Sequence, residues 1–321
     1  MPLQIIKQDI TELECDAIVN STNNGLIGRG NSVDGRIHWK AGFELQKACI
    51  LLGGCETGKA KVTAGFSLPC KHIIHTVAPR WMGGEFKERE FLHSCYIESL
   101  NLAKQLNCTS VAFPLLASGT YGYPKDLACQ VAMQEIKKFL EENDMLIYLV
   151  LYDEETLYIA EQTRVEVENY IEENYQETEI IPIMQECAIF DEDDFETEIA
   201  ETLKSKEETF SCMLNRKIEE KGIKNSVCYK RANVDKKLFS KIMSNINYQP
   251  KKETVLAFVI ALELSMEEAE EMLERAGYAI SHSRKADLIV EYFIKRKRYD
   301  IFEVNETLYN FGEPLLGSSV R

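Results

Sequence analysis

The sequence predicts an α/β fold followed by a separate all-α domain, and three observations support this prediction. In the N-terminal half, short apolar segments typical of strands alternate with amphipathic segments of helical periodicity. Two of the apolar segments lead directly into glycine-rich loops. Beyond residue 171 the composition becomes acidic, and then changes to short helical patterns rich in lysine. Alternating strands and helices are typical of a layered structure with a largely parallel central sheet.

Six segments of the N-terminal half are apolar and rich in β-branched residues, which favours strands. They are 3–6, 17–19, 60–64, 73–76, 110–115 and 146–151. Four further segments carry apolar residues at helical spacing. These predicted helices are 35–52, 88–106, 125–143 and 154–175. Together the segments account for an α/β unit that covers about half of the chain.

Two of the predicted strands end in loops suited to binding phosphate. The first loop contains Gly28 and Gly30 and follows the strand that ends at Val19, and the second is Ser118–Gly122. Glycine allows a backbone to approach a ligand closely, and N–H groups ahead of a helix bind anions. A helix is expected after each loop, with Asp34 as N-cap of the first. Ligands bind beyond the carboxyl ends of parallel strands, and both loops lie at such ends. Since each loop can bind a phosphate, we expect one ligand that carries two phosphates.

Several short motifs, taken in their order along the chain, resemble the macrodomain family. They are Asp9-Ile10-Thr11, Val19–Asn23, Val33-Asp34-Gly35 with Ile37-His38, Gly53-Gly54-Cys55, Leu68-Pro69 followed by Ile74–Val77, and Ser118–Pro124. The resemblance implies a three-layer α/β/α macrodomain over residues 1–171, with a mixed, largely parallel central sheet.

The resemblance also implies a site for ADP-ribose or an ADP-ribosylated substrate. In macrodomains the residue that matches Asp9 accepts a hydrogen bond from the adenine amino group, and the backbone of the next residue, Ile10, borders the base. Tyr152 is expected to stack on the other face of the adenine. The diphosphate and the distal ribose are expected to contact the two loops, through Gly28, Gly30, Val33, Ser118, Gly119, Thr120, Tyr121 and Gly122.

Asn23 and Asp34 are the residues expected to take part in catalysis. Asn23 can present a donor and an acceptor to a sugar hydroxyl, whereas Asn20 is expected to pin the loop. In hydrolytic macrodomains the residue that matches Asp34 helps to activate water near the distal ribose. The resemblance therefore implies an enzyme that hydrolyses ADP-ribosyl linkages, either by de-ADP-ribosylation or by deacetylation of O-acetyl-ADP-ribose.

Two departures from the family pattern leave other functions open. The loop between Asn23 and Val33 is one residue longer than usual, and Ala117-Ser118 stands where the family often has Ser-Thr. The alternative is a non-catalytic reader of ADP-ribose, or of a related NAD-derived nucleotide, coupled to a DNA-binding tail. A DNA-binding regulator with a degenerate macrodomain is disfavoured, because the predicted ligand-binding and catalytic residues are retained.

The composition argues against several other classes of protein. No apolar run approaches the ~20 residues of a membrane-spanning helix, and the N-terminus lacks the pattern of a signal peptide. The ten cysteines contain no Cys-x-x-Cys pair, which is typical of reduced thiols in a cytoplasmic protein. No Cys/His spacing matches a zinc site, and His38 and His75 are expected to be structural. We therefore predict neither a metal nor a cofactor.

The C-terminal half divides into an acidic linker and a helical domain. Residues 172–208 hold fourteen Asp/Glu and two Lys, a net charge of −12 that is typical of a solvated segment. Residues 209–321 contain five short helical patterns and a further helical region over 287–311. The five patterns are 210–221, 226–231, 236–244, 252–262 and 266–275.

Residues 221–252 carry a net charge of +8 in a chain of net charge −15. Short basic helices joined by the tight connection Asn233-Val234-Asp235 resemble a helix-turn-helix of the phage-repressor type. The resemblance implies DNA binding through Lys236, Lys237 and Lys241 on the second helix. The alternative is a helical bundle whose basic face docks the acidic linker, because runs of charge usually lie at the surface.

Overall fold

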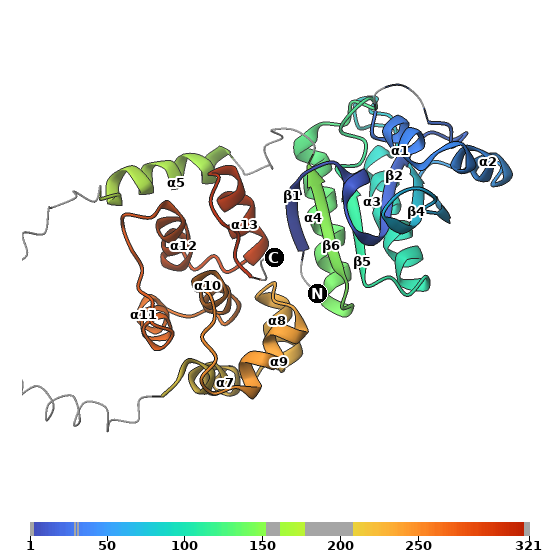
Figure 1. The fold of residues 1–321 in the computed structure, drawn as a ribbon. Helices are drawn as coiled ribbons and strands as arrows, with labels where there is room; N and C mark the ends of the chain where they lie inside the picture. Colours follow the sequence, from blue (N-terminus) through green and yellow to red (C-terminus); the bar gives the residue numbers. More distant parts are fainter. Residues whose placement is uncertain (1–2, 29, 31, 152–160, 177–207, 318–321) are drawn as a thin grey trace, which may run out of the picture.

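The structure is a computed structural model that describes residues 3–28, 30, 32–151, 161–176 and 208–317. An α/β unit and a helical unit lie side by side (Figure 1). The α/β unit contains the six predicted strands, which are thereby confirmed. They are β1 (Leu3–Lys7), β2 (Cys15–Thr22), β3 (Ala60–Ala64), β4 (Cys70–Val77), β5 (Ser110–Pro114) and β6 (Leu146–Leu151).

The six strands form one mixed sheet in the order β1-β6-β5-β2-β4-β3. Only β3 is antiparallel to its neighbour, and the other paired strands are parallel. In the interior strands β2 and β5, Ala17, Ile18, Val19 and Val111 are almost completely buried. Burial on both faces explains why these segments are continuously apolar instead of alternating. The predicted mixed, largely parallel sheet is confirmed.

Helices cover both faces of the sheet. On one face, α3 (Glu88–Gln105) and α4 (Lys125–Glu142) bury residues such as Tyr96 and Ile136 against the strands. On the other face, α1 (Val33–Ala41) and α2 (Phe43–Leu51) bury Ile37 and Leu45. The single helix predicted over 35–52 is two helices, because Gly42 adopts a φ of 89° between them. Three layers result, as predicted.

The helical unit contains the C-terminal helices around one buried central helix. α10 (Lys252–Ala261) is apolar from Val255 to Ala261, and all of its residues except Glu253 are buried. The five predicted helical patterns are confirmed, and the further helical region over 287–311 contains parts of two helices. The described helices are α5 (Glu161–Asn174), α7 (Phe210–Glu220), α8 (Asn225–Arg231), α9 (Lys236–Ser244), α10 (Lys252–Ala261), α11 (Met266–Arg275), α12 (Lys285–Lys295) and α13 (Ile301–Asn310).

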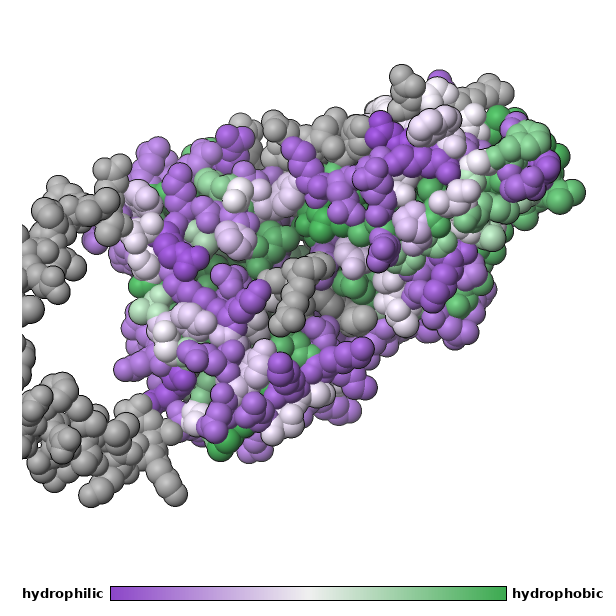
Figure 2. All heavy atoms as spheres, in the orientation of Figure 1, coloured by the Kyte–Doolittle hydropathy of each residue, from purple (hydrophilic) through white to green (hydrophobic). Residues whose placement is uncertain are grey.

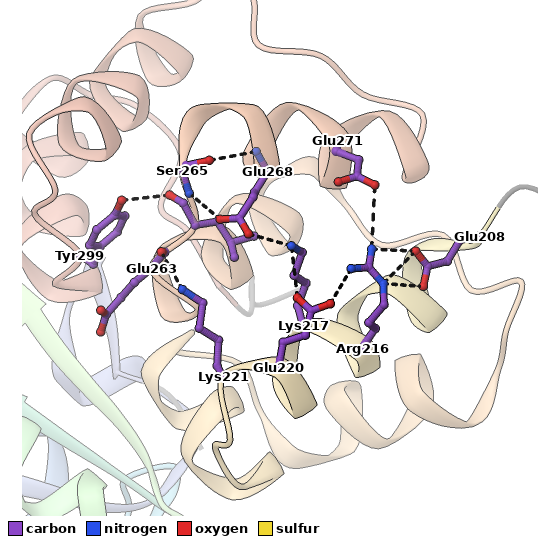
Figure 3. A network of polar contacts seen from close by, with 11 residues as sticks. Glu208, Arg216, Lys217, Glu220, Lys221, Glu263, Ser265, Glu268, Glu271 and Tyr299 are labelled. Carbon is purple, nitrogen blue, oxygen red and sulfur yellow. Dashed lines mark hydrogen bonds and ion pairs between the residues drawn. The ribbon is translucent and has the colours of Figure 1, made fainter.

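A polar network joins α7 to α11 within the helical unit (Figure 3). Lys217 on α7 donates to Glu268 on α11 at 2.7 Å, and Glu268 also completes a capping box with Ser265 at the start of α11. Arg216 pairs with Glu208 through two guanidinium nitrogens, the shorter contact being 2.9 Å. Because Lys217 and Glu268 are both partly shielded from water, this pair fixes how α7 lies against α11.

Helix α5 packs with the helical unit, not with the sheet. Val167 and Ile171 are buried in the core of the C-terminal helices, and Tyr292 of α12 donates to Glu166 at 2.5 Å. Figure 1 shows α5 beside α12. The buried apolar side chains of α5 therefore belong to the core of the helical unit.

The two units meet along β1 and α4. β1 is an edge strand, and the side-chain amide of Asn233 satisfies both backbone groups of Leu3: it accepts from N–H at 2.8 Å and donates to C=O at 2.9 Å. Lys137 of α4 pairs with Asp300, the N-cap of α13, at 2.5 Å. Leu3 begins its strand, so the helical unit is attached away from the carboxyl end of β1.

Exposed apolar side chains gather on α1 and α2. Trp39, Phe43, Ile50 and Leu51 have exposed fractions between 67% and 88%, and Figure 2 shows hydrophobic surface at the end of the molecule formed by α2. Apolar patches of this kind are typical of surfaces that contact other molecules.

The described residues also bear on two of the predicted absences. Nine cysteines fall in the described part of the chain; all nine are free thiols, and eight are buried. Within the ranges that the structure describes, no helix combines the length and the apolar character needed to cross a membrane.

Candidate functional site

Four neighbouring parallel strands, β1, β6, β5 and β2, end at the same edge of the sheet. Asp9 follows β1, Asn23 follows β2 and Ser118 lies shortly after β5. The structure therefore brings these predicted residues to one edge, where ligands bind in sheets of this type. Tyr152 follows β6 and lies outside the described residues, so its predicted contact with adenine stays a prediction.

Asp9 caps the short 3₁₀ helix η1 (Ile10–Glu12) and faces two cations. Its carboxylate accepts from the N–H of Thr11 at 3.0 Å, and its Oδ2 lies 3.1 Å from Arg36 Nη1 and 3.4 Å from Lys40 Nζ. Burial alone would raise the pKa of Asp9, but hydrogen bonds from Thr11 and Arg36 and the charge of Lys40 lower it to about 2. Asp9 is therefore an ionised acceptor, which is compatible with the predicted adenine contact, and Ile10 beside it is buried.

Asn23 folds the loop that follows β2. Its Oδ1 accepts from the N–H of Gly25 at 3.1 Å, and its Nδ2 donates to the carbonyl of Ile27 at 2.7 Å. In this structure Asn23 therefore pins its own loop, which is the role that the sequence suggested for Asn20. Asn20 is completely buried and faces Asp34 instead.

The two glycines of this loop have different roles. A Cβ on Gly28 would lie 2.4 Å from the ring of His38, so only glycine fits there. Gly30 has a φ of 63° and lies in the left-handed region. Arg29 and Asn31 lie outside the described residues. Val33 begins α1 and packs against the core below it.

Asp34 lies in the first turn of α1 and is not its N-cap. Ser32 is the N-cap, and its hydroxyl accepts from the N–H of Gly35 at 3.2 Å. The capping prediction was wrong because Ser32 supplies the cap, which leaves Asp34 free to turn inward. Asp34 is 6% exposed, and its Oδ1 lies 2.8 Å from Asn20 Nδ2 and 3.6 Å from His38 Nε2.

Burial sets the protonation of the groups around Asp34. It raises the pKa of Asp34, although the hydrogen bond from Asn20 and the charge of a protonated His38 act in the opposite direction. Burial lowers the pKa of His38, and burial together with His38 lowers the pKa of His75 to about 3. A carboxylate with a raised pKa is a better general base near neutral pH, and the two imidazoles beside it are neutral there.

The second loop presents backbone donors. Ala117 and Gly122 both have positive φ, 64° and 66°, and the N–H of Gly122 donates to the carbonyl of Gly119 at 2.9 Å. The N–H groups of Ser118, Gly119 and Thr120 have no partner among the described residues. Successive free N–H groups in such a turn form an anion-binding concavity.

Sequence reasoning missed the segment between β4 and α3, which flanks this loop. Arg80 lies over the ring of Tyr121 at 5.6 Å, and the N–H of Trp81 donates to the carbonyl of Tyr121 at 2.9 Å. The buried carboxylate of Glu88 accepts from three backbone N–H groups of the segment, those of Met82, Gly84 and Phe86. The Gly83-Gly84 pair ahead of a helix was the available signal.

Three effects shift the pKa of Tyr121 in the second loop. Burial raises it, the charge of Arg80 lowers it, and the carboxylate of Asp34 raises it further.

His38, Cys49 and His75 bring three potential metal ligands within 4.8 Å of one another. Both ring nitrogens of His75 already face polar partners, Asn20 Nδ2 at 3.2 Å and Thr63 Oγ1 at 2.9 Å. Burial raises the pKa of Cys49 to about 11, so the thiol keeps its proton. The chemistry of this cluster fits buried hydrogen bonding better than a metal centre, and it agrees with the structural role expected for the two histidines.

Comparison with known proteins places the α/β unit in a family. The family model of the Macro domain matches residues 19–132. A macro domain-containing protein of Methanosarcina mazei is 46% identical over 156 residues, which are 48% of this chain and 83% of that protein. A protein of Citrobacter rodentium named O-acetyl-ADP-ribose deacetylase is 45% identical over 160 residues, 48% of this chain and 90% of that protein. The chain belongs to the macro domain family.

A solved structure is also similar to part of this chain. The Oceanobacillus iheyensis macrodomain with ADP is 42% identical and covers 47% of this chain and 84% of its own, with a TM-score of 0.45. These relatives therefore match about half of the present chain.

Proposed function

We propose that this protein binds ADP-ribose at the carboxyl edge of its sheet and hydrolyses ADP-ribosyl ester linkages there, with Asp34 as general base. The observation that carries the proposal is the buried Asp34 carboxylate, 2.8 Å from the amide of Asn20, in a site that also offers free backbone N–H groups. A relative at 45% identity that is named O-acetyl-ADP-ribose deacetylase supports it.

The proposed reaction uses water as the only co-substrate. Asp34 takes a proton from water, and the resulting hydroxyl adds to the carbon of the ester as the C–O bond breaks. The proton then passes to the departing oxygen, which restores the carboxylate. The N–H groups of Ser118, Gly119 and Thr120 hold the diphosphate, and Asp9 accepts from the adenine amino group.

The test compares the wild type with Asp34→Asn on O-acetyl-ADP-ribose and on a mono-ADP-ribosylated glutamate peptide. The substituted amide would keep an acceptor for Asn20 but lose the base, so turnover should fall about 10²–10⁴-fold, while ADP-ribose affinity by calorimetry stays within a few fold. Glu44→Gln, on the exposed face of α2, is the matched control. Normal turnover by a folded Asp34→Asn protein would refute the assignment.

A reader without turnover is the second candidate, and the geometry of Asn23 favours it. The hydrogen bonds of the Asn23 amide go to its own loop, which leaves only one Nδ2 hydrogen for a sugar hydroxyl. Tight binding of ADP-ribose with no turnover of either ester by the wild type would select the reader over the hydrolase.

We also propose, for the helical unit, a basic face that binds DNA. Lys236, Lys237 and Lys241 are exposed on α9, whereas Phe239 and Ile242 are buried in the core. This amphipathic arrangement is the observation in favour, since it leaves the lysine face of the helix open to phosphates. The face is smaller than the local charge suggests, because Lys252 is buried and paired with Asp287.

A shift assay with the full chain on a random-sequence duplex tests DNA binding. Charge reversal at Lys237 and Lys241 should abolish a complex that weakens steeply with salt, while reversal of Lys47 and Lys104 on the α/β unit should not. Equal loss in both variants, or no complex at low salt, would favour a purely structural bundle. The free thiols support a cytoplasmic location, and the packing of α5 supports a division in which this helix belongs to the second unit.

A further inference from the structure

A chain of four buried polar side chains leads from the edge of the sheet to Asp34. Thr63 lies on β3, His75 on β4, Asn20 on β2 and Asp34 on α1, and none is more than 9% exposed. Asn20 and His75 are register partners on neighbouring strands. The contacts are Thr63 Oγ1–His75 Nε2 at 2.9 Å, His75 Nδ1–Asn20 Nδ2 at 3.2 Å, and Asn20 Nδ2–Asp34 Oδ1 at 2.8 Å.

The contacts between these four side chains define one consistent set of hydrogen positions, and His75 Nε2 also lies 3.9 Å from the thiol of Cys49. Asn20 Nδ2 carries two hydrogens and donates one to the Asp34 carboxylate and one to His75 Nδ1. His75 must therefore accept at Nδ1 and carry its proton on Nε2, which donates to the hydroxyl of Thr63. That hydroxyl donates in turn to the carbonyl of Ala64 at 3.2 Å. The low pKa of His75 keeps the ring neutral, and a neutral ring has one tautomer that fits.

Reversing the donors and acceptors of this hydrogen-bonded chain would be unfavourable at Asp34. If Nδ1 of His75 carried the proton, Asn20 would have to turn its Oδ1 toward the ring, and the same oxygen would face the Asp34 carboxylate. Two acceptors would then oppose each other in a buried site, unless Asp34 took up a proton. The tautomer of His75 thus controls whether Asp34 meets a donor or an acceptor.

We infer that Thr63 and His75 are positioning residues, which hold the Asn20 amide with its donor toward Asp34 and so keep Asp34 ionised and oriented as a base. The inference rests on the proposed hydrolase function, because it assigns a role in the same site. Neither residue touches the substrate in this scheme, and both act through Asn20.

The first test compares two substitutions at Thr63 in the full chain. Thr63→Val keeps the shape but removes the acceptor for His75 Nε2–H, which favours the other tautomer, whereas Thr63→Ser keeps the hydroxyl. With O-acetyl-ADP-ribose, Thr63→Val should lower kcat by about 10–100-fold, with KM and ADP-ribose affinity little changed. Thr63→Ser should remain close to the wild type. Equal kcat in the Val and Ser variants would overturn the inference.

The pH profile supplies a readout that a merely structural role would not move. In Thr63→Val the acid limb of kcat should shift to higher pH, since Asp34 must then be protonated to meet the Asn20 oxygen. The described titratable groups that interact with Asp34 are His38 on α1, Cys49 on α2 and Tyr121 in the second loop, and His75 on β4 contacts Asn20 beside it. The pKa values of Cys49 and Tyr121 are raised, so neither is charged near neutral pH. An acid limb at the same pH in both variants would contradict the inference.

A second measurement does not depend on turnover. Nitrogen-15 spectra of the histidine rings in the wild type should show His75 as the Nε2–H tautomer between pH 6 and 8, and Thr63→Val should convert it to Nδ1–H. A wild-type ring protonated at Nδ1 would overturn the inference whatever the enzyme assay gives. A wild type that shows the expected tautomer but never hydrolyses either ester would overturn the proposed function and leave the hydrogen-bond chain intact.

Discussion

Replacing Asn233 should loosen the attachment of the helical unit to the sheet. The Asn233 amide satisfies the buried N–H and C=O of Leu3 at 2.8 and 2.9 Å. Each buried backbone group left without a partner costs about 1–3 kcal/mol. Because Asn233 has a φ of 53°, Asn233→Gly removes both bonds without adding strain, and it should lower the free energy of unfolding by about 2–4 kcal/mol.

Two further substitutions separate the hydrogen bonds from the backbone. Asn233→Ala should be less stable than the glycine variant by about 1–2 kcal/mol, since alanine is strained in the left-handed region. Asn233→Asp keeps an acceptor for the Leu3 N–H and loses the donor, so it should fall between the wild type and glycine.

Urea unfolding of the full chain provides the assay for this series. Circular dichroism reports both units, whereas the fluorescence of Trp39 and Trp81 reports the α/β unit alone. A loosened attachment should separate the two transitions. The reasoning would be refuted by an Asn233→Gly protein that unfolds within about 0.5 kcal/mol of the wild type, a difference well below the loss of one buried hydrogen bond.

Single carboxyl or imidazole groups provide three further tests. Asp9→Ala should weaken ADP-ribose binding by about 1–3 kcal/mol in calorimetry, and an unchanged affinity would remove Asp9 from the adenine site. Burial, with the nearby charges of Asp300 and Glu303, raises the pKa of Glu306 from its ordinary value of 4.5 to about 8. Its contribution to the free energy of unfolding is therefore complete below pH 4.5 and is lost as the pH rises through 8. The free energy of unfolding of Glu306→Gln, measured by thermal melts, should therefore rise relative to that of the wild type between pH 5 and 8, by up to about 1.4 kcal/mol per pH unit. A difference between the two proteins that stays constant with pH would contradict this. Burial lowers the pKa of His75 to about 3, so its contribution is present above 6.5 and is lost as the pH falls toward 3. His75→Gln should flatten this acid loss of stability, and an equally steep loss in the variant would assign it to another group.

Local patterns determined most of the fold of the α/β unit. All six strands were predictable, because strands buried on both faces are continuously apolar and are bounded by turn residues. The glycine loops predicted the edge at which the site lies, because loops after parallel strands gather at one edge. Asp9 and Asp34 could be named from their motifs, and both lie at that edge in the structure.

Other features depend on contacts between residues far apart in the sequence. Nothing local shows that Ser32, and not Asp34, caps α1, because both residue types serve as N-caps. The segment from Arg80 to Glu88 becomes part of the site only by packing beside Tyr121. Similarly, α5 has the same periodicity whether it covers the sheet or the C-terminal core.

The sequence by itself determined the macro domain family, the order of helices and strands along the chain, and the identity of the carboxylates at the site. The tertiary structure alone decided what those carboxylates meet: cations at Asp9, and a buried chain of amide, imidazole and hydroxyl behind Asp34. It also decided that Asn233, predicted as a connection in a DNA-binding motif, caps the edge of the sheet. The physical reason is that periodicity and turn propensity are properties of neighbouring residues, whereas pKa values and buried hydrogen bonds depend on which distant groups share a desolvated space.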